Sequence, residues 1–189
     1  LATDFAATTL DGTAVSLSDF YGQPIVLETG SFTCPQYVYR ISPMNKLARQ
    51  YPNITFLVLY VREAHPGQRI PEHHSLLEKT QLAYRVANEE AENRHILVDD
   101  LAGTAHQAYG GLPNMLYVID ENGRIAFRAD WNNHKTAVRL LDHLTKGKSL
   151  TNMRFGFRPV GLPILLRVLR RAGWDAFFDF VFSLPNLIK

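Results

Sequence analysis

The only cysteine of this 189-residue chain, Cys34, lies in the segment GSFTCPQYVY, between a strongly apolar stretch and a predicted helix. Pro35 suits the first turn of a helix, which places the sulfur at a helix N-terminus. There the free N–H groups and the positive end of the helix dipole stabilise a thiolate, so the sequence predicts a lowered pKa for Cys34. The hydroxyls of Ser31 and Thr33 can donate to that thiolate. A free cysteine is more often a small buried hydrophobe, but a Ser-Phe-Thr-Cys-Pro turn favours a nucleophile.

A second thiol is missing, because Tyr37 stands where a dithiol enzyme carries its resolving cysteine. An oxidised Cys34 must therefore be released by an external thiol, and we expect a reductant such as thioredoxin or glutathione and no bound cofactor. One cysteine also excludes an internal disulfide and a cysteine-based zinc site. The spacing of His65, His73 and His74 matches no known ligand pattern, so no metal is expected.

The elements that must position Cys34 alternate between strands and helices, which predicts an α/β fold of thioredoxin-like type with a central mixed sheet flanked by helices. Asp11-Gly12 and Asn122-Gly123 predict hairpins, the second of which adds antiparallel strands at one edge. In open sheets ligands bind beyond the carboxyl ends of the strands, where Cys34 falls. Between the hairpins we expect strands at 24–30, 53–61 and 95–100, with helices at 35–51, 76–91 and 102–110, and a last helix at 135–147.

Length and composition fit one domain, residues 1–150, followed by a basic and aromatic helical extension, residues 151–189. The net charge of +2 is too small to make nucleic acid the main partner. No apolar run reaches the roughly 20 residues of a membrane span. The chain begins at Leu1 rather than methionine, which leaves room for a trimmed signal peptide or anchor. The compartment stays open, with the cytoplasm or the periphery of a membrane as the best matches.

Two segments resemble the iodothyronine deiodinases. GSFTCPQY is similar to the active-site segment of that family, in which selenocysteine stands at the position of Cys34. LVLYVREAHPG is similar to its tyrosine-x-x-glutamate-x-histidine segment, here Tyr60, Glu63 and His65, and IPEHHSL resembles a stretch whose family histidine falls on His73. The resemblance covers about residues 5–145 as a fold. The start of the chain also resembles peroxiredoxins and membrane-tethered thioredoxin-like reductases.

The resemblance implies a thiol-dependent oxidoreductase that removes iodide reductively from an aromatic substrate. Cys34 would attack the iodine, with Ser31 and Thr33 supporting it, because a soft thiolate suits a polarisable iodine. Cysteine in place of selenocysteine should slow this step, and it could equally be an engineered replacement.

The resemblance also implies a proton relay from Tyr60, Glu63 and His65 to the carbon that iodine leaves, while His73 holds or helps to protonate the substrate. Tyr60 ends a strand and the other residues follow in the loop, so all can converge on Cys34. The plainer interpretation makes Tyr60 a strand end, Glu63 a solvated carboxylate and His65 a turn residue.

Phe32, Pro113 and Met115 are the expected substrate contacts. Pro113 precedes a strand, at the position where thioredoxin-like folds carry a cis-proline facing the nucleophile, although an ordinary trans proline fits the dipeptide equally well. Met115 stands where the family has a substrate-contacting arginine, which weakens the case for an iodothyronine as the natural substrate.

The extension reads as two short helices, the first starting near Pro163 and ending at Gly173. Its aromatic run from Phe177 to Phe182 covers more than one helix face, so we expect it to be buried, by packing or in a homodimer, ahead of membrane-surface contact through residues 161–189. The extension carries six basic and two acidic residues: Arg154, Arg158, Arg167, Arg170, Arg171 and Lys189 against Asp175 and Asp179.

Two other functions remain open. A one-cysteine peroxidase would cycle Cys34 through sulfenic acid; Ser31 matches the peroxiredoxin hydroxyl position, but Leu27 stands where that motif has proline. A redox-sensing or partner-binding module without catalysis would use the extension.

Overall fold

The computed structural model describes residues 1–150, 153 and 156–187. Seven strands form one mixed sheet in the order β2-β1-β5-β4-β3-β6-β7. The central strand β3 pairs in parallel with β4 and antiparallel with β6, so the residue after β3 emerges near the middle of the sheet. The strands are β1 (Ala6–Thr9), β2 (Ala14–Ser16), β3 (Ile25–Gly30), β4 (Thr55–Tyr60), β5 (His95–Val98), β6 (Leu116–Ile119) and β7 (Ile125–Ala129).

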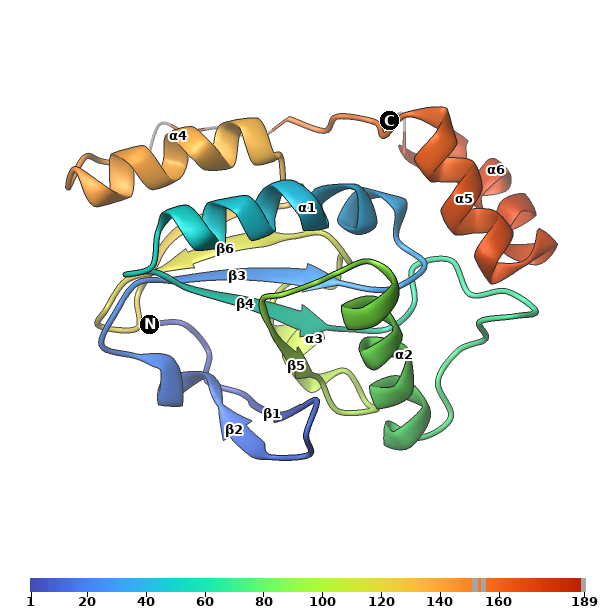
Figure 1. Ribbon diagram of the computed structural model, residues 1–189, viewed down its shortest axis with the longest axis horizontal. Coiled ribbons are helices and arrows are strands. Elements are labelled where there is room, and N and C mark those ends of the chain that lie inside the picture. Colours follow the sequence, from blue (N-terminus) through green and yellow to red (C-terminus); the bar gives the residue numbers. More distant parts are fainter. Residues whose placement is uncertain (151–152, 154–155, 188–189) are drawn as a thin grey trace.

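Helices cover both faces of this sheet. α1, α2 and α4 pack on one face, while α3 and the N-terminal segment pack on the other. Figure 1 shows α5 and α6 beyond the ends toward which β3 and β4 point. The helices are α1 (Pro35–Gln50), α2 (Leu76–Glu89), α3 (Thr104–Ala108), α4 (His134–Thr145), α5 (Leu162–Ala172) and α6 (Trp174–Leu187), with a 3-10 turn at Leu17–Phe20.

Alternation of side chains along the strands explains why the core has two sides. On β4, Val58 and Tyr60 face α1 and α2, whereas Leu57 and Leu59 face the N-terminal side. A strand buried on both faces reads as a continuous apolar run, which is why TFLVLY at residues 55–60 is recognisable in the sequence.

The predicted architecture is confirmed. The hairpin at Asp11-Gly12 joins β1 to β2, and the one at Asn122-Gly123 joins β6 to β7 at the sheet edge. α5 starts with a proline in its first turn and ends at Gly173, as predicted. No helix in the described part of the chain has the length and apolarity needed to cross a membrane.

The C-terminal helices pack partly on the rest of the chain. Leu169 and Ala176 are fully buried, and Phe180 packs against the same cluster. Packing within the chain does not bury the whole aromatic run, because Phe178 and Phe182 are 53% and 76% exposed, and burial in a homodimer or at a membrane surface stays a prediction. Arg154 and Lys189, counted in the basic charge of the extension, lie outside the described residues.

Candidate active site around Cys34

Cys34 is the N-cap residue of α1, directly after the turn that leaves β3. Its amide donates to the carbonyl of Ser31 at 3.2 Å, and its carbonyl accepts from the amide of Val38 at 3.0 Å. The turn is tight because a Cβ at Gly30 would lie 2.5 Å from the ring of Tyr37. The sequence therefore predicts correctly that the sulfur lies at a helix start beyond the carboxyl end of a central strand.

Glu63 is the centre of a buried hydrogen-bond network beside Cys34. Its Oε2 accepts from the amide of Thr33 at 2.8 Å and from the Thr33 hydroxyl at 2.6 Å, and its Oε1 accepts from the hydroxyl of Tyr60. Burial raises the pKa of Glu63, although these donors oppose the shift. The pKa of Tyr60 is raised well above its ordinary value, by burial first and then by the nearby Glu63 charge. Burial therefore shifts both groups toward their protonated forms.

Two further hydrogen bonds fasten the loop after β4 to the cysteine turn. The amide of Ala64 donates to the Ser31 hydroxyl at 3.2 Å, and the amide of His65 donates to the Thr33 hydroxyl at 3.1 Å. The hydroxyls of Ser31 and Thr33, which precede Cys34, thus hold the loop after β4. Glu63 is buried, which excludes the interpretation that it is a solvated loop carboxylate.

The two predicted histidines take different positions. Nε2 of His73 lies 3.7 Å from Oε1 of Glu63, and its ring centroid lies 6.0 Å from that of Tyr60. The ring of His65 instead packs edge-on against Phe180 of α6, at 5.4 Å between centroids. Burial lowers the pKa of His73, which favours a neutral imidazole there.

The predicted low pKa of Cys34 is wrong for this arrangement. The residue is only 4% exposed, and burial raises the pKa of its thiol to about 11. Backbone N–H groups of Gln36 and Tyr37 at the helix start and the charge of Arg40 act in the predicted direction, but they are weaker than the loss of hydration. Cys34 shares a buried cluster with Val38 of α1 and with residues of α5.

The three expected substrate contacts lie in different environments. Phe32 is fully buried, with the guanidinium of Arg171 3.5 Å from its ring centroid. Met115 is fully buried in the cluster on the opposite face of the sheet from Cys34. Pro113 follows a trans peptide bond, since the described residues contain no cis bond, so the cis-proline expectation is wrong.

A polar cavity of about 400 Å³ opens on Glu63 and His73 from the side away from Thr33. Its lining includes Lys79 and His106, which the sequence did not single out. Lys79 is buried and donates to the carbonyl of Asp100 at 2.8 Å. Both ring nitrogens of His73 and Nε2 of His106 are buried and have no hydrogen-bond partner among the described residues. A second hollow, about 520 Å³, lies at the other ends of the strands, far from Cys34.

A buried ion network under α1 was also missed by sequence reasoning. Arg94 donates to Glu28 of β3 and to Glu92, and Tyr37 of α1 donates to Glu92 at 2.9 Å. Asn132 completes the network by donating to Glu28 at 2.6 Å. The one available signal was Glu28 inside the apolar stretch PIVLETG, because a buried carboxylate requires a partner. The described residues contain no group of histidine, cysteine or acidic side chains arranged to hold a metal ion.

The model of the family described as iodothyronine deiodinase matches residues 3–144, more than half of the chain. The chain belongs to the iodothyronine deiodinase family. Members of this family are oxidoreductase enzymes, and the sequence resemblance is confirmed. Helices α5 and α6 lie outside the part that matches the family.

Individual family members align over 56% of the chain. The thyroxine 5-deiodinase of Sus scrofa is 33% identical over 116 residues, which are 56% of this chain and 37% of that protein. The type I iodothyronine deiodinase of Xenopus laevis is 30% identical over 115 residues, or 56% of this chain and 45% of that protein. The alignments thus span less than half of the length of these relatives.

Solved structures show the same fold at low identity. A hypothetical protein from Sinorhizobium meliloti 1021 superposes with a TM-score of 0.66 at 16% identity, covering 81% of this chain and 86% of that one. A thioredoxin-like protein from Aeropyrum pernix superposes with a TM-score of 0.56 at 15% identity, covering 74% and 88%. The thioredoxin-like fold is confirmed.

Proposed function

We propose that this chain removes iodide reductively from an aromatic substrate, with Cys34 as the nucleophile and an external thiol as the reductant. One observation carries the proposal: in a member of the deiodinase family, the only thiol lies next to Thr33, whose amide and hydroxyl both donate to the buried carboxyl of Glu63. A nucleophile and a proton-holding network are thus adjacent in the chain and joined through one residue.

The chemistry balances with the groups present and one added thiol. Sulfur of Cys34 bonds to iodine as the aryl carbon–iodine bond breaks, and the carbon takes the proton that the thiol gives up. A reductant thiol then attacks the oxidised sulfur and releases iodide, leaving a mixed disulfide. A second reductant thiol restores Cys34 and leaves as the oxidised disulfide. Because no other cysteine exists in the chain, both thiols come from outside, from a class such as thioredoxin or glutathione.

The network is suited to moving the proton in the first step. Burial raises the pKa of Glu63 and of Tyr60, so either can pass a proton to a carbanion-like carbon and then take up the proton that the Cys34 thiol gives up. His73 lies 3.7 Å from Glu63 and lines the polar cavity, so it can carry protons between the network and the cavity. Ser31 and Thr33 hold the loop after β4 against the cysteine turn, and His65 contributes to this attachment through its backbone amide while its ring packs against Phe180.

The natural substrate class that follows from the family is an iodothyronine, although a buried Met115 replaces the substrate-contacting arginine. The role of Phe32 would be to form the apolar wall behind the sulfur, and Pro113 would border the substrate.

The test compares iodide release from aryl iodides in excess dithiol with consumption of hydroperoxide by the same preparation. We expect iodide release that Cys34→Ser abolishes. Hydroperoxide consumption without iodide release would establish the peroxidase alternative instead. Iodide release that survives Cys34→Ser, or the absence of both activities, would refute the proposal.

A further inference from the structure

The C-terminal helices lie on top of the segment that carries Cys34. Leu169 and Ala172 of α5 and Ala176 of α6 are fully buried in the same cluster as Cys34. These helices lie beyond the region that matches the deiodinase family. The buried cluster that contains the sulfur is therefore completed by a part of the chain that the family match does not contain.

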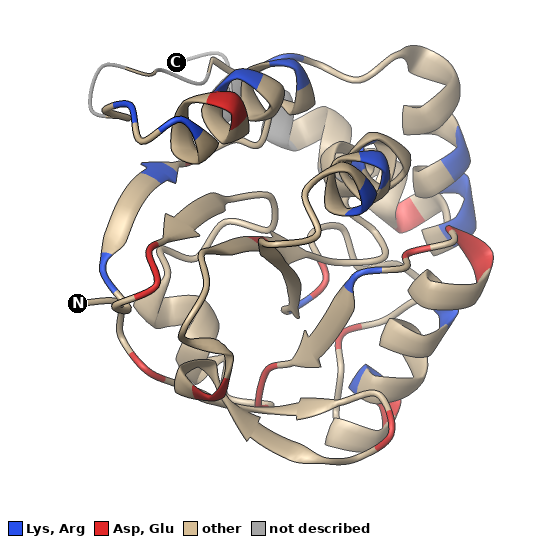
Figure 2. Ribbon diagram, turned by 60° about the vertical axis from the view of Figure 1, so that its left-hand side comes forward, with Lys and Arg blue, Asp and Glu red and all other residues tan. Residues whose placement is uncertain are grey.

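A single arginine joins α5 to the cysteine turn. Arg171 donates to the backbone carbonyl of Phe32 at 2.7 Å and stacks 3.5 Å from the centroid of the Phe32 ring. The guanidinium of Arg171 also forms an ion pair with Glu90, the C-cap residue of α2. Arg167 adds two hydrogen bonds of 2.7 and 2.8 Å to the same carboxylate. Figure 2 shows the basic stretch of α5 beside the acidic end of α2.

The loop that carries the relay residues meets the junction of α5 and α6. The amide of Arg69 donates to the carbonyl of Ala172 at 2.9 Å. Gly67 lies so near that junction that a Cβ there would come within 2.5 Å of the same carbonyl oxygen. The ring of His65 packs against Phe180 of α6. The helix pair thus contacts both the cysteine turn and the relay loop.

The outer side of the pair is exposed, which limits how strongly it is held. Within α5 only Val168, Leu169 and Ala172 are buried. Leu162 of α5 and Trp174 of α6 are 63% and 69% exposed. Segments with few buried apolar side chains open at a lower free energy than the whole fold. The arginine contacts therefore add to a limited set of buried apolar contacts that keep the pair in place.

We propose that α5 and α6 form a cap that controls the access of substrate and reductant to Cys34, and that Arg171, with Arg167 and Glu90, is the latch that holds it closed. The functional meaning of the cap rests on the proposed role of Cys34. Opening the cap frees the carbonyl and ring of Phe32 and brings water to the sulfur, while the sheet and α1 stay in place.

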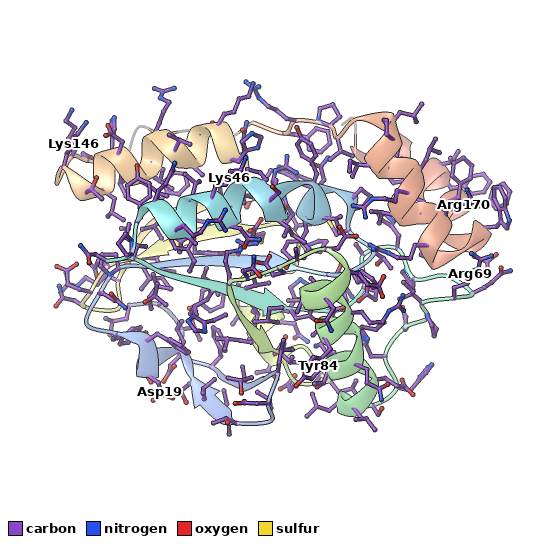
Figure 3. The ribbon with its side chains drawn as sticks, viewed as in Figure 1. Asp19, Lys46, Arg69, Tyr84, Lys146 and Arg170 are labelled. Atoms are coloured by element: carbon purple, nitrogen blue, oxygen red, sulfur yellow. The ribbon has the colours of Figure 1, made fainter. Side chains whose placement is uncertain are left out.

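The experiment uses the sole cysteine as its own reporter. Full-length protein is alkylated with iodoacetamide, an uncharged reagent, under native conditions at fixed pH, and the rate of modification at Cys34 is measured by intact mass. We expect Arg171→Ala and Glu90→Gln to accelerate modification by about tenfold or more, because the latch loses a hydrogen-bonded charge pair. Arg170→Ala is the matched control, since Arg170 lies on the exposed side of the same helix (Figure 3), and its rate should stay within about twofold of wild type.

A second control separates cap opening from general loosening. Ile119→Val removes one methyl group from the cluster on the opposite face, at a cost of about 1 kcal/mol, without touching the cap. Equal acceleration in Ile119→Val or Arg170→Ala would overturn the proposal, as would wild-type rates in both Arg171→Ala and Glu90→Gln. If Arg171→Ala fails to fold, Glu90→Gln gives the same decision. If the latch variants are alkylated faster but the protein releases no iodide, the proposed function is refuted and the proposal of a cap stands.

Discussion

The hydroxyl of Thr33 lies 2.6 Å from Oε2 of Glu63, so the residue before the only cysteine is hydrogen-bonded to a buried carboxyl from a different strand–loop unit. The same hydroxyl accepts from the amide of His65 at 3.1 Å. Any substitution that removes it takes one of three donors from the buried Glu63 carboxyl and removes the acceptor of the His65 amide.

We predict that Thr33→Val lowers the free energy of unfolding by about 1–3 kcal/mol, because unsatisfied buried groups lose their hydration without compensation. Thr33→Ser keeps the hydroxyl and should cost less. Urea unfolding followed by circular dichroism measures both. Thr80→Val is the control, since Thr80 donates only to the Leu76 carbonyl on an exposed helix face. Equal losses for Thr33→Val and Thr80→Val would contradict the buried network.

Glu63→Gln separates the structural and chemical roles of the carboxyl. Glutamine resembles the protonated acid that burial favours, so we expect a stability change of about 1 kcal/mol or less. Loss of the transferable proton should reduce iodide release by about 100-fold or more. Steady-state kinetics and urea unfolding of the same preparation decide between these effects. A variant with full activity would remove Glu63 from the relay.

The pH dependence of stability reports the state of Cys34. Its pKa rises from the ordinary 9.0 to about 11 on folding. Because the folded state holds the proton more tightly, the thiol stabilises the fold fully below pH 9, and that contribution is lost as pH rises from 9 to 11. The loss should reach about 2–3 kcal/mol in wild type relative to Cys34→Ser. The difference between the two proteins cancels the contributions of the tyrosines and lysines that both contain to the pH dependence of stability. A difference that grows in favour of wild type at high pH would instead support a thiolate stabilised by the helix.

The ion network under α1 should be more sensitive than any surface pair. Arg94→Met leaves the carboxylates of Glu28 and Glu92 buried without their cation, and we expect a loss of about 3–5 kcal/mol. Arg85→Met breaks an exposed pair with Glu89 one helical turn away and should cost less than about 1 kcal/mol. Thermal unfolding of both variants tests the contrast, and comparable losses would show that the buried network contributes no more than a surface pair.

Local sequence patterns were sufficient to predict the fold. The apolar runs of β3 and β4, the Asn-Gly turn at residue 122 and the Pro163–Gly173 boundaries are short-range signals, and each fixes one element. The meeting of Thr33 with Glu63 also follows, since β3 and β4 are neighbouring parallel strands whose carboxyl ends share one edge.

The ionisation of Cys34 could not be predicted in the same way. Its position at a helix start is local, but its hydration depends on Leu169 and Ala172, more than 130 residues later in the chain. Lys79 and His106 lie on separate helices and meet only across the cavity, so no spacing in the sequence links them. Met115 was expected at the substrate, yet it is buried in the core cluster on the other face of the sheet, just before β6.

The position of β3 between β4 and β6 has an evolutionary consequence. The hydrogen bonds between Thr33 and Glu63 join the segments that follow two neighbouring strands and do not involve the last two helices. Sequence change in those helices can therefore alter the hydration of the sulfur, and with it the pKa of Cys34, while this pairing stays in place.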